Sequence, residues 1–302
     1  MSASWKLSAF APKKAVQDAL LAHDELEEWD FDLVISGREV AEDRPQDWVL
    51  EAWYPSKPAK AQTAALAQLF SGKPPKIEIE QLPDEDWLAI SQQGVEPIHA
   101  GRFYVHTPEF EPQPGAINFA IPAAQAFGTG QHRTTAGCLE MLSAMKQRGL
   151  VARNIADIGT GTGLLGFAAM ALWPGAKSTA SDIDAVCAHV VEDNAALNAI
   201  ALGSAPGEMT MVIADGMADP LLQMRGPYDL LIANILAGPL VELAPDFAGA
   251  VAPRGSILLA GLLAGEQEQA VRRAYRKAGF RPVARLERGD WAILWFRRRP
   301  HP

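Results

Sequence analysis

The chain is poor in cysteine and has no apolar run long enough to cross a bilayer. Two cysteines, Cys138 and Cys187, stand among 302 residues, too few for a disulfide framework and without metal-ligand spacing. The longest nearly unbroken apolar stretch, Leu164–Trp173, is far shorter than the ~20 residues that span a membrane. No basic and apolar leader opens the sequence. We therefore expect a soluble, cytoplasmic protein with no metal site and no membrane contact.

Positive charge is scarce in the first third of the chain. Residues 1–110 carry ten Lys and Arg against nineteen Asp and Glu, whereas residues 111–302 carry seventeen of each. Between Asp24 and Asp32, six of nine residues are acidic. Such a surface repels nucleic acid phosphates and attracts a basic partner, so no direct nucleic acid binding is expected. An acidic run is more often simply a solvated face, and that interpretation stays open.

The length suggests about two domains, and 48% hydrophobic residues are enough to build their cores. The first 82 residues predict the order βαββαβ, typical of a ferredoxin-like α+β domain. Residues 83–115 are rich in proline and glycine and predict a linker with structured pieces. The expected elements of both segments are strands at Trp5–Phe10, Phe31–Ile35, Trp48–Trp53, Ile77–Leu82 and Phe103–His106, helices at Pro12–Leu21, Ala59–Phe70 and Asp84–Gln93, and turns over Ser36–Gln46.

Residues 116–302 change to short apolar strands that alternate with helices. This alternation predicts an α/β domain with a mostly parallel, doubly wound sheet, closed by an antiparallel C-terminal hairpin, and a ligand at the carboxyl ends of its strands. The expected strands are Ile155–Ile158, Ser178–Ile183, Met209–Ala214, Leu230–Ala233 and Ile257–Ala260, with the hairpin at Val283–Leu286 and Trp291–Phe296. The expected helices are Thr135–Gln147, Gly163–Leu172, Ala185–Leu197, Leu240–Ala250 and Gly265–Ala278.

A glycine-rich turn follows the first of these strands. Gly159, Gly161 and Gly163 lead directly into a helix, so the backbone turns tightly and a ligand can approach it closely. The spacing Gly161-x-Gly163-x-x-Gly166 also satisfies the dinucleotide fingerprint, and an ordinary tight turn has the same residues. The glycines alone therefore do not distinguish one nucleotide cofactor from another.

Three polar residues at strand ends indicate which kind of cofactor could bind. Asp182 lies about twenty residues beyond the glycines, where a carboxylate accepts the ribose hydroxyls of a nucleoside, while Asp184 reads as a helix cap. Asp157 puts negative charge where a pyrophosphate would lie and favours a cationic ligand such as a sulfonium. Asn234 could accept hydrogen bonds from an amine, although an isolated asparagine there is more often a turn residue.

Four segments together resemble the PrmA family of ribosomal protein methyltransferases: Phe127–Thr135, Asp157–Gly163, Asp182–Asp184 and Ala233–Leu240. The resemblance implies a class I methyltransferase domain, of Rossmann-like fold, after a ferredoxin-like substrate-recognition domain. It also implies S-adenosyl-L-methionine as methyl donor and large-subunit ribosomal protein eleven as the substrate, methylated on lysine and N-terminal amines. The residues expected at the donor are Thr135, Asp157, Gly159, Gly161, Gly163, Asp182 and Asn234, with Asn234 also catalytic.

The match is not complete. Arg133 stands where many family members have proline, and Thr160 and Thr162 replace a commoner Cys and Ser. His132 is more readily explained as a hydrogen-bonded loop residue than as a base. For Thr135 we expect a position at the start of a helix, where free backbone amides can meet the donor's carboxylate.

The implied reaction is an in-line attack of a neutral amine on a sulfonium methyl group. Removing the proton from an ordinary lysine at pH 7 costs ~4.6 kcal/mol, against ~1 kcal/mol for an α-amine. Two other hypotheses remain at this stage. The glycine spacing suits a nicotinamide-dependent oxidoreductase, and the acidic first third suits a non-catalytic adaptor for basic proteins.

Overall fold

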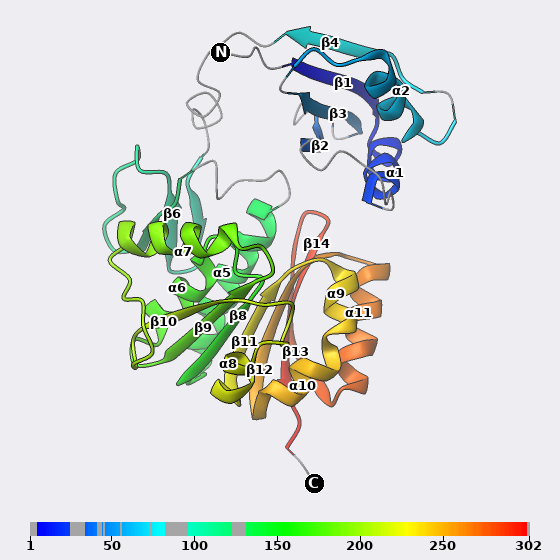
Figure 1. Ribbon diagram of the computed structural model, residues 1–302. Helices are drawn as coiled ribbons and strands as arrows, with labels where there is room; N and C mark the ends of the chain where they lie inside the picture. Colours follow the sequence, from blue (N-terminus) through cyan, green and yellow to red (C-terminus); the bar gives the residue numbers. More distant parts are fainter. Residues whose placement is uncertain are drawn as a thin grey trace. The chain divides into compact units, whose positions relative to one another are not determined.

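The computed structural model describes residues 5–24, 34–40, 44, 46–54, 56–72, 74–81, 96–122 and 131–300. The chain divides into two compact units, Met1–Ile90 and Ser91–Pro302 (Figure 1). Several predicted features fall wholly or partly outside the described residues: the acidic run after Asp24, the first three residues of the strand Phe31–Ile35, the helix Asp84–Gln93 and the Phe127–Gly130 part of the family motif.

The first unit is a four-stranded antiparallel sheet with two helices. Its sheet order is β2-β3-β1-β4, which confirms the βαββαβ prediction. Apolar side chains of β1 and β3, such as Leu7 and Leu50, form the core together with Val16 and Leu66 of the helices. The elements are β1 (Trp5–Pro12), α1 (Lys13–Asp24), β2 (Val34–Glu39), β3 (Asp47–Tyr54), α2 (Lys60–Gln68) and β4 (Ile77–Gln81).

The expected turn at Ser36–Gln46 is wrong at its start, because Ser36–Glu39 is part of strand β2. Tertiary contacts explain the difference. Arg38 donates two hydrogen bonds to Glu51 on the neighbouring strand, at 2.8 and 3.1 Å. At Gly37 a Cβ would lie only 2.8 Å from Val16 of α1, so glycine allows strand and helix to approach.

The second unit begins with a small sheet, of which two of the three strands lie inside the predicted linker. Its strands are β5 (Ile98–Ala100), β6 (Phe103–His106) and β7 (Ile117–Ala120), in the order β5-β6-β7. Phe103 and Phe119 belong to the same buried cluster as Leu139 of the following helix. The strand at Phe103–His106 is confirmed, and apolar burial makes it part of the second unit.

The main sheet of this unit has seven strands in the order β10-β9-β8-β11-β12-β14-β13. β10, β9, β8, β11 and β12 pair in parallel, whereas β14 and β13 are antiparallel, so the predicted sheet and hairpin are confirmed. The strands are β8 (Asn154–Ile158), β9 (Lys177–Asp182), β10 (Met209–Ile213), β11 (Tyr228–Asn234), β12 (Val251–Leu263), β13 (Phe280–Arg288) and β14 (Trp291–Arg298).

Helices cover both faces of this sheet (Figure 1). Alternate residues of one strand enter different cores: Ile232 of β11 packs with α5, α6 and α7, and its neighbour Leu231 packs with α8 to α11. This is the burial that a doubly wound parallel sheet requires. The helices are α5 (Gln131–Gln147), α6 (Leu164–Leu172), α7 (Val186–Leu197), α8 (Pro220–Arg225), α9 (Ala237–Glu242), α10 (Ala244–Ala250) and α11 (Glu266–Lys277).

Two helix predictions differ from the structure. The expected helix Leu240–Ala250 is two helices, and Pro245 in the first turn of α10 accounts for the break. Helix α8 was not expected from the sequence, although Asp219 caps it by accepting a hydrogen bond from Leu221 N at 2.7 Å. Among the helices in the described part of the chain, none has the length and apolar character needed to span a membrane.

Candidate active site

The glycine turn between β8 and α6 is tied to the end of the neighbouring strand. The backbone amides of Gly159 and Thr160 both donate to the carbonyl oxygen of Ser181 in β9, at 2.8 and 2.9 Å. Gly159, Gly161 and Gly163 have φ of 70°, 55° and 84°, a conformation that L side chains rarely adopt. Their sequence spacing therefore corresponds to one rigid turn.

The three glycines differ in what surrounds them. A Cβ at Gly159 would lie 2.2 Å from Ile235 Cγ2, and one at Gly163 would lie 2.6 Å from Phe167 Cζ. A Cβ at Gly161 would have no atom within 4 Å. Two of the glycines are thus required by packing, whereas Gly161 borders open space in which a ligand could approach the main chain.

The side chain of Asp157 is enclosed by the turn and bonds to it. Its side chain is 1% exposed, and Oδ2 accepts hydrogen bonds from Thr160 Oγ1 at 2.7 Å and from Gly166 N at 2.9 Å. Burial raises the pKa of Asp157 to about 6, and the negative charge of Asp182 adds to this, while the two hydrogen bonds oppose it. Asp157 therefore shapes the turn, and its predicted contact with a cationic ligand stays a prediction.

Asp182 stands at the carboxyl end of β9, and its carboxylate can accept further hydrogen bonds. Its Oδ2 accepts from Gly161 N at 2.8 Å and its Oδ1 from Asp184 N at 3.1 Å, and the Cys187 thiol is a further neighbour of the carboxylate, which still has lone pairs for other donors. The side chain is only partly buried. Two adjacent hydroxyl groups could still donate to it. Asp184 accepts from Val186 N, the first residue of α7, at 2.9 Å, but the N-cap of this helix is Ala185, so Asp184 lies one residue before the position expected for it.

Asn234 is the last residue of β11, which lies directly beside β8 in the sheet. The residue after it is wedged between two glycines. A Cβ at Gly261 of β12 would lie 2.2 Å from the carbonyl oxygen of Ile235, and Gly159 meets the same residue from the other side. These close approaches fix where the strand ends and therefore where the partly buried Asn234 side chain begins.

The start of α5 differs from the prediction. The helix begins at Gln131, so Thr135 lies in its second turn and not at its first residue. The free amides of the helix start therefore belong to residues before Thr135, and its predicted contact with the donor rests on its side chain. Arg133 is exposed beside the β13–β14 turn, where a Cβ at Gly289 would lie 2.5 Å from Arg133 Nη1. The side chain of His132 lies outside the described residues.

Two asparagines support the site, Asn194 in α7 and Asn198 at the C-cap of this helix, and neither was expected from the sequence. Asn194 Nδ2 donates to the carbonyl oxygen of Thr162 in the glycine turn at 3.0 Å. Asn198 accepts from Ala120 N and donates to Ala120 O, both at 2.8 Å, at the end of β7. Residues four apart share one helix face, so this face braces the turn and the strand before the Phe127–Thr135 motif. The available signal was Asn194, because asparagine is unfavourable inside a helix.

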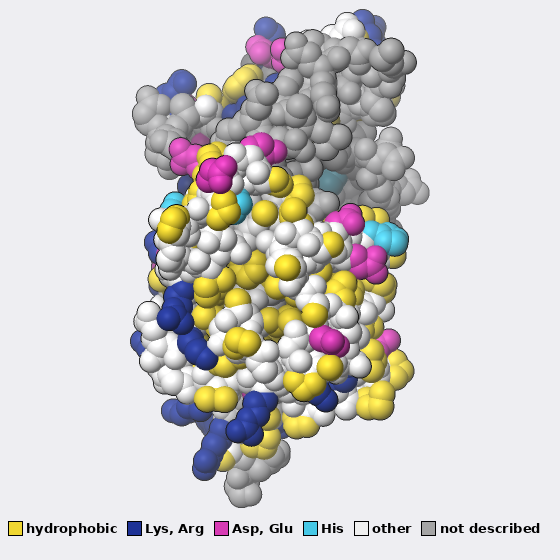
Figure 2. All heavy atoms as spheres, turned by 90° about the vertical axis from the view of Figure 1, so that its left-hand side faces the viewer, with side chains coloured by type: hydrophobic (Ala, Val, Ile, Leu, Met, Phe, Trp, Pro, Cys, Tyr) yellow, Lys and Arg dark blue, Asp and Glu magenta, His cyan; other side chains and the backbone are white. Residues whose placement is uncertain are grey.

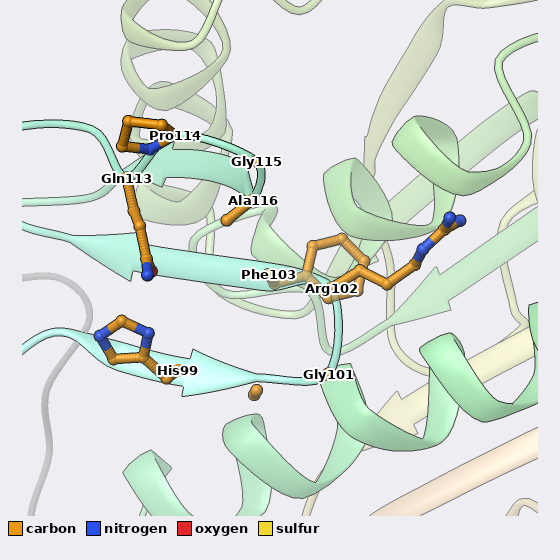
Figure 3. A pocket seen from close by; sticks show the side chains of 9 residues that line it. His99, Gly101, Arg102, Phe103, Gln113, Pro114, Gly115 and Ala116 are labelled. Carbon is orange, nitrogen blue, oxygen red and sulfur yellow. The ribbon is translucent and has the colours of Figure 1, made fainter.

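A separate hollow of about 340 Å³ lies on the three-stranded sheet (Figure 3). His99 and Gln113 extend toward one another across it, whereas Arg102 extends away. None of the predicted site residues lines this hollow. The site residues predicted from the sequence lie elsewhere, at the carboxyl ends of β9, β8 and β11.

Comparisons with known proteins identify relatives across the chain. A family model described as "Ribosomal protein L11 methyltransferase (PrmA)" matches residues 13–299. The chain is 39% identical over 269 residues to the ribosomal protein L11 methyltransferase of Rhizobium meliloti (strain 1021), covering 87% of this chain and 89% of the relative. It is 43% identical over 234 residues to that of Sinorhizobium fredii, covering 76% of each chain.

A solved structure is also similar. The ribosomal protein L11 methylase from Lactobacillus delbrueckii subsp. bulgaricus has a TM-score of 0.56 at 24% sequence identity. The alignment covers 68% of this chain and 100% of that chain. At this identity the similarity shows a common fold.

Proposed function

Since the chain belongs to the ribosomal protein L11 methyltransferase family, we propose that the carboxyl edge of its seven-stranded sheet is the methyl-transfer site. The protein is an S-adenosylmethionine-dependent protein methyltransferase that acts on ribosomal protein L11. Membership of this family sets aside both the nicotinamide oxidoreductase and the non-catalytic adaptor as hypotheses.

One observation carries the placement of the site. The register pairs Ile158 with Ser181 on one side and with Ala233 on the other, so Gly159, Asp182 and Asn234 follow at adjacent strand ends. The residues present fit S-adenosylmethionine: the open space at Gly161 admits a ligand to the backbone, and Asp182 keeps lone pairs for ribose hydroxyls. We propose that Thr135, Gly159, Gly161, Gly163, Asp182 and Asn234 hold the donor.

The donor, when bound, supplies an electrophilic methyl group on a positively charged sulfur. The chain has to deliver a neutral amine with its lone pair directed at that carbon. We assign this to Asn234, whose side-chain oxygen can accept one N–H of the amine and so orient the remaining lone pair. Removal from water lowers the pKa of the amine and reduces the ~4.6 kcal/mol that deprotonating a lysine costs at pH 7. Most of the rate then comes from alignment.

The first unit is proposed to recognise the protein substrate. Residues 1–82 would hold ribosomal protein L11, residues 83–115 would connect, and residues 116–302 would bind the donor. Residues 1–82 carry fourteen Asp and Glu against nine Lys and Arg, and this excess of acidic charge supports the division, because ribosomal proteins are typically basic. The amines proposed as acceptors are lysine side chains and the N-terminal α-amine, and the proposed compartment is the cytoplasm.

The decisive experiment combines the purified protein, isotope-labelled S-adenosylmethionine and purified ribosomal protein L11. Peptide mapping by mass spectrometry should find the label on lysine Nζ and on the N-terminal nitrogen. Calorimetry should show binding of S-adenosylmethionine and none of NADH. A preparation that binds the donor but transfers no label to L11, or labels other atoms, would overturn the assignment of acceptors.

A further inference from the structure

The charge balance of residues 111–302 hides a strongly basic end. Residues 251–302 carry eleven Lys and Arg against four Asp and Glu, a net charge of +7 in a chain of net charge −9. Three of these cations are paired: Arg272 and Arg285 contact Glu268, and Arg288 contacts Glu140. The other eight form no ion pair with any carboxylate in the described part of the chain: Arg254, Arg273, Arg276, Lys277, Arg281, Arg297, Arg298 and Arg299.

The fold brings the chain segments that carry these eight residues together at one edge of the sheet. Arg281 and Arg297 are direct cross-strand partners, and Arg297 Nε donates to the carbonyl oxygen of Arg254 at 2.9 Å. The backbone of Arg299 bonds Gly279, which directly follows the last turn of α11 with Arg276 and Lys277. This edge, which we call the arginine edge, lies at the start of β12 and therefore opposite the carboxyl edge that holds Asn234. Figure 1 marks the carboxyl terminus at this lower end of the sheet, and Figure 2, viewed from the side of α7 and β10, also shows dark blue side chains at the lower end of the molecule.

Three structural explanations account for only part of the arginine edge. Cations in the last turn of a helix favour its dipole, which covers Arg276 and Lys277. Charges on an edge strand prevent pairing with another sheet, which covers Arg281 on β13. A third explanation covers Arg297 and Arg298, whose side chains donate to the carbonyl oxygens of Arg254 and Val251. None of the three applies to the side chains of Arg254 or Arg299. Like charges directly opposite each other, as at Arg281 and Arg297, are destabilising, so the cluster costs stability in the isolated protein.

We propose that the arginine edge binds the phosphate backbone of RNA without reading its sequence. Seven of the eight cations are arginine, the side chain that binds phosphate through paired hydrogen bonds. Among residues 251–300, the single exposed large apolar side chain is that of Val283, at 36%. An interface with an acidic protein would need an apolar centre, and a lipid surface would need apolar side chains to insert. A sugar-phosphate backbone needs neither.

This inference qualifies the expectation that the protein does not bind nucleic acid, which rested on the acidic first third. Exposed charges are screened beyond about 8–10 Å at ordinary ionic strength, so a local basic edge can act against a net negative chain. Binding through phosphates alone has a defined signature: it weakens with salt in proportion to the number of phosphates neutralised. It should also be similar for RNAs of unrelated sequence.

The test measures fluorescence anisotropy of a labelled RNA duplex and a labelled single strand, between ~50 and ~200 mM salt, with the full chain. The variant reverses the charge of three exposed cations whose side chains form no hydrogen bond within the described part of the chain: R276E, R281E and R299E. The control reverses three exposed cations elsewhere, K60E, K76E and R102E, with the same change in net charge. We expect the variant to lose about tenfold or more in affinity and about two units of salt slope on single strands, and the control to stay within about twofold.

Binding of S-adenosylmethionine by each variant verifies that it is folded, independently of any methylation result. The proposal is overturned if the unmodified protein does not bind either RNA, or if variant and control lose affinity equally. It is also overturned if polyglutamate displaces the RNA as effectively as a second RNA does, because the partner would then be an acidic protein. A dimer that the variant alone dissociates would assign the arginine edge to self-association.

Discussion

The two units of this protein use their polar side chains in opposite ways. In the first unit, Lys6 and Arg38 both pair with Glu51, at 3.4 and 2.8 Å, so these polar groups satisfy one another. In the second unit, Asp182 and Gly161 meet at 2.8 Å but leave lone pairs and open space. The difference follows from strand direction. Carboxyl ends converge at one edge only in a parallel sheet, so the second unit can concentrate chemistry where the first can offer only a surface.

Separating the two units should have the largest effect on methylation. Removing residues 1–90 should abolish methylation of ribosomal protein L11, a loss of about a hundredfold or more, while the affinity for S-adenosylmethionine changes by less than about twofold. The cut belongs at residue 90, because a cut at 115 would remove β5 and β6 and expose the core around Phe103. Assays of donor binding and of L11 methylation check this. Undiminished methylation would place substrate recognition in the second unit.

Within the second unit, Asn234→Ala should lower kcat by about a hundredfold, because a misplaced amine loses alignment with the methyl group. The affinity for the donor should change by less than about threefold. Asn118→Ala, which truncates an equally half-buried asparagine on β7, is the matched control and should keep its kcat. Steady-state kinetics with L11 measure both variants. Equal rates for the two would remove Asn234 from the reaction.

For Asp182→Ala we expect the dissociation constant of S-adenosylmethionine to rise by roughly 10–150-fold, the 1.5–3 kcal/mol of hydrogen bonds to a charged group. Asp184→Ala deletes the same charge two residues away and should change this constant by less than about threefold. Calorimetry on both proteins makes the comparison. If the two substitutions weakened binding alike, only the net charge of the loop would matter.

Asp157→Asn separates the charge of the buried acid from its hydrogen bonds, since an amide oxygen can accept from Thr160 and Gly166 as Oδ2 does. The pKa of Asp157 is raised from 3.8 to about 6 in the folded state. The folded protein therefore binds the proton more tightly than the unfolded chain, and this stabilisation is present below pH ~4 and lost as pH rises to about 6. Over that window the Asn variant should gain roughly 1–3 kcal/mol of unfolding free energy relative to the unmodified protein. Urea unfolding at several pH values measures it, and parallel curves would contradict it.

The smallest effect concerns the acidic run of the first unit. Neutralising Asp24, Glu25, Glu27 and Glu28 should slow association with L11 severalfold at low salt and flatten its salt dependence, because exposed charges act mainly on the association rate. Stopped-flow mixing at two salt concentrations is sufficient. Unchanged rates at low salt would mean that the run is a solvated face, and that the first unit recognises L11 through other contacts.

The prediction from sequence was most accurate where a local pattern and its structural meaning coincide. The glycine spacing of Gly159, Gly161 and Gly163 marked a turn because no other residue adopts those φ angles readily. Asn194, Asn198 and Gly261 were missed because their partners, Thr162, Ala120 and Ile235, are distant along the chain or in another strand. The second part of strand β2, Ser36–Glu39, was mistaken for a turn for the same reason, since pairing with β3 outweighs the turn propensity of Ser36 and Gly37.

Hydrophobic period and residue chemistry were enough to predict the two domains, the parallel sheet and the identity of the polar residues at its strand ends. What each polar residue is able to do depends instead on tertiary contacts. Asp157 and Asp182 are alike in sequence, yet the first is enclosed by its own turn and the second keeps open lone pairs. Likewise, a balanced charge count became an arginine edge only when β12, β13, β14 and α11 met. Burial and proximity between distant segments are properties of the fold, and they decide which groups remain available to a ligand.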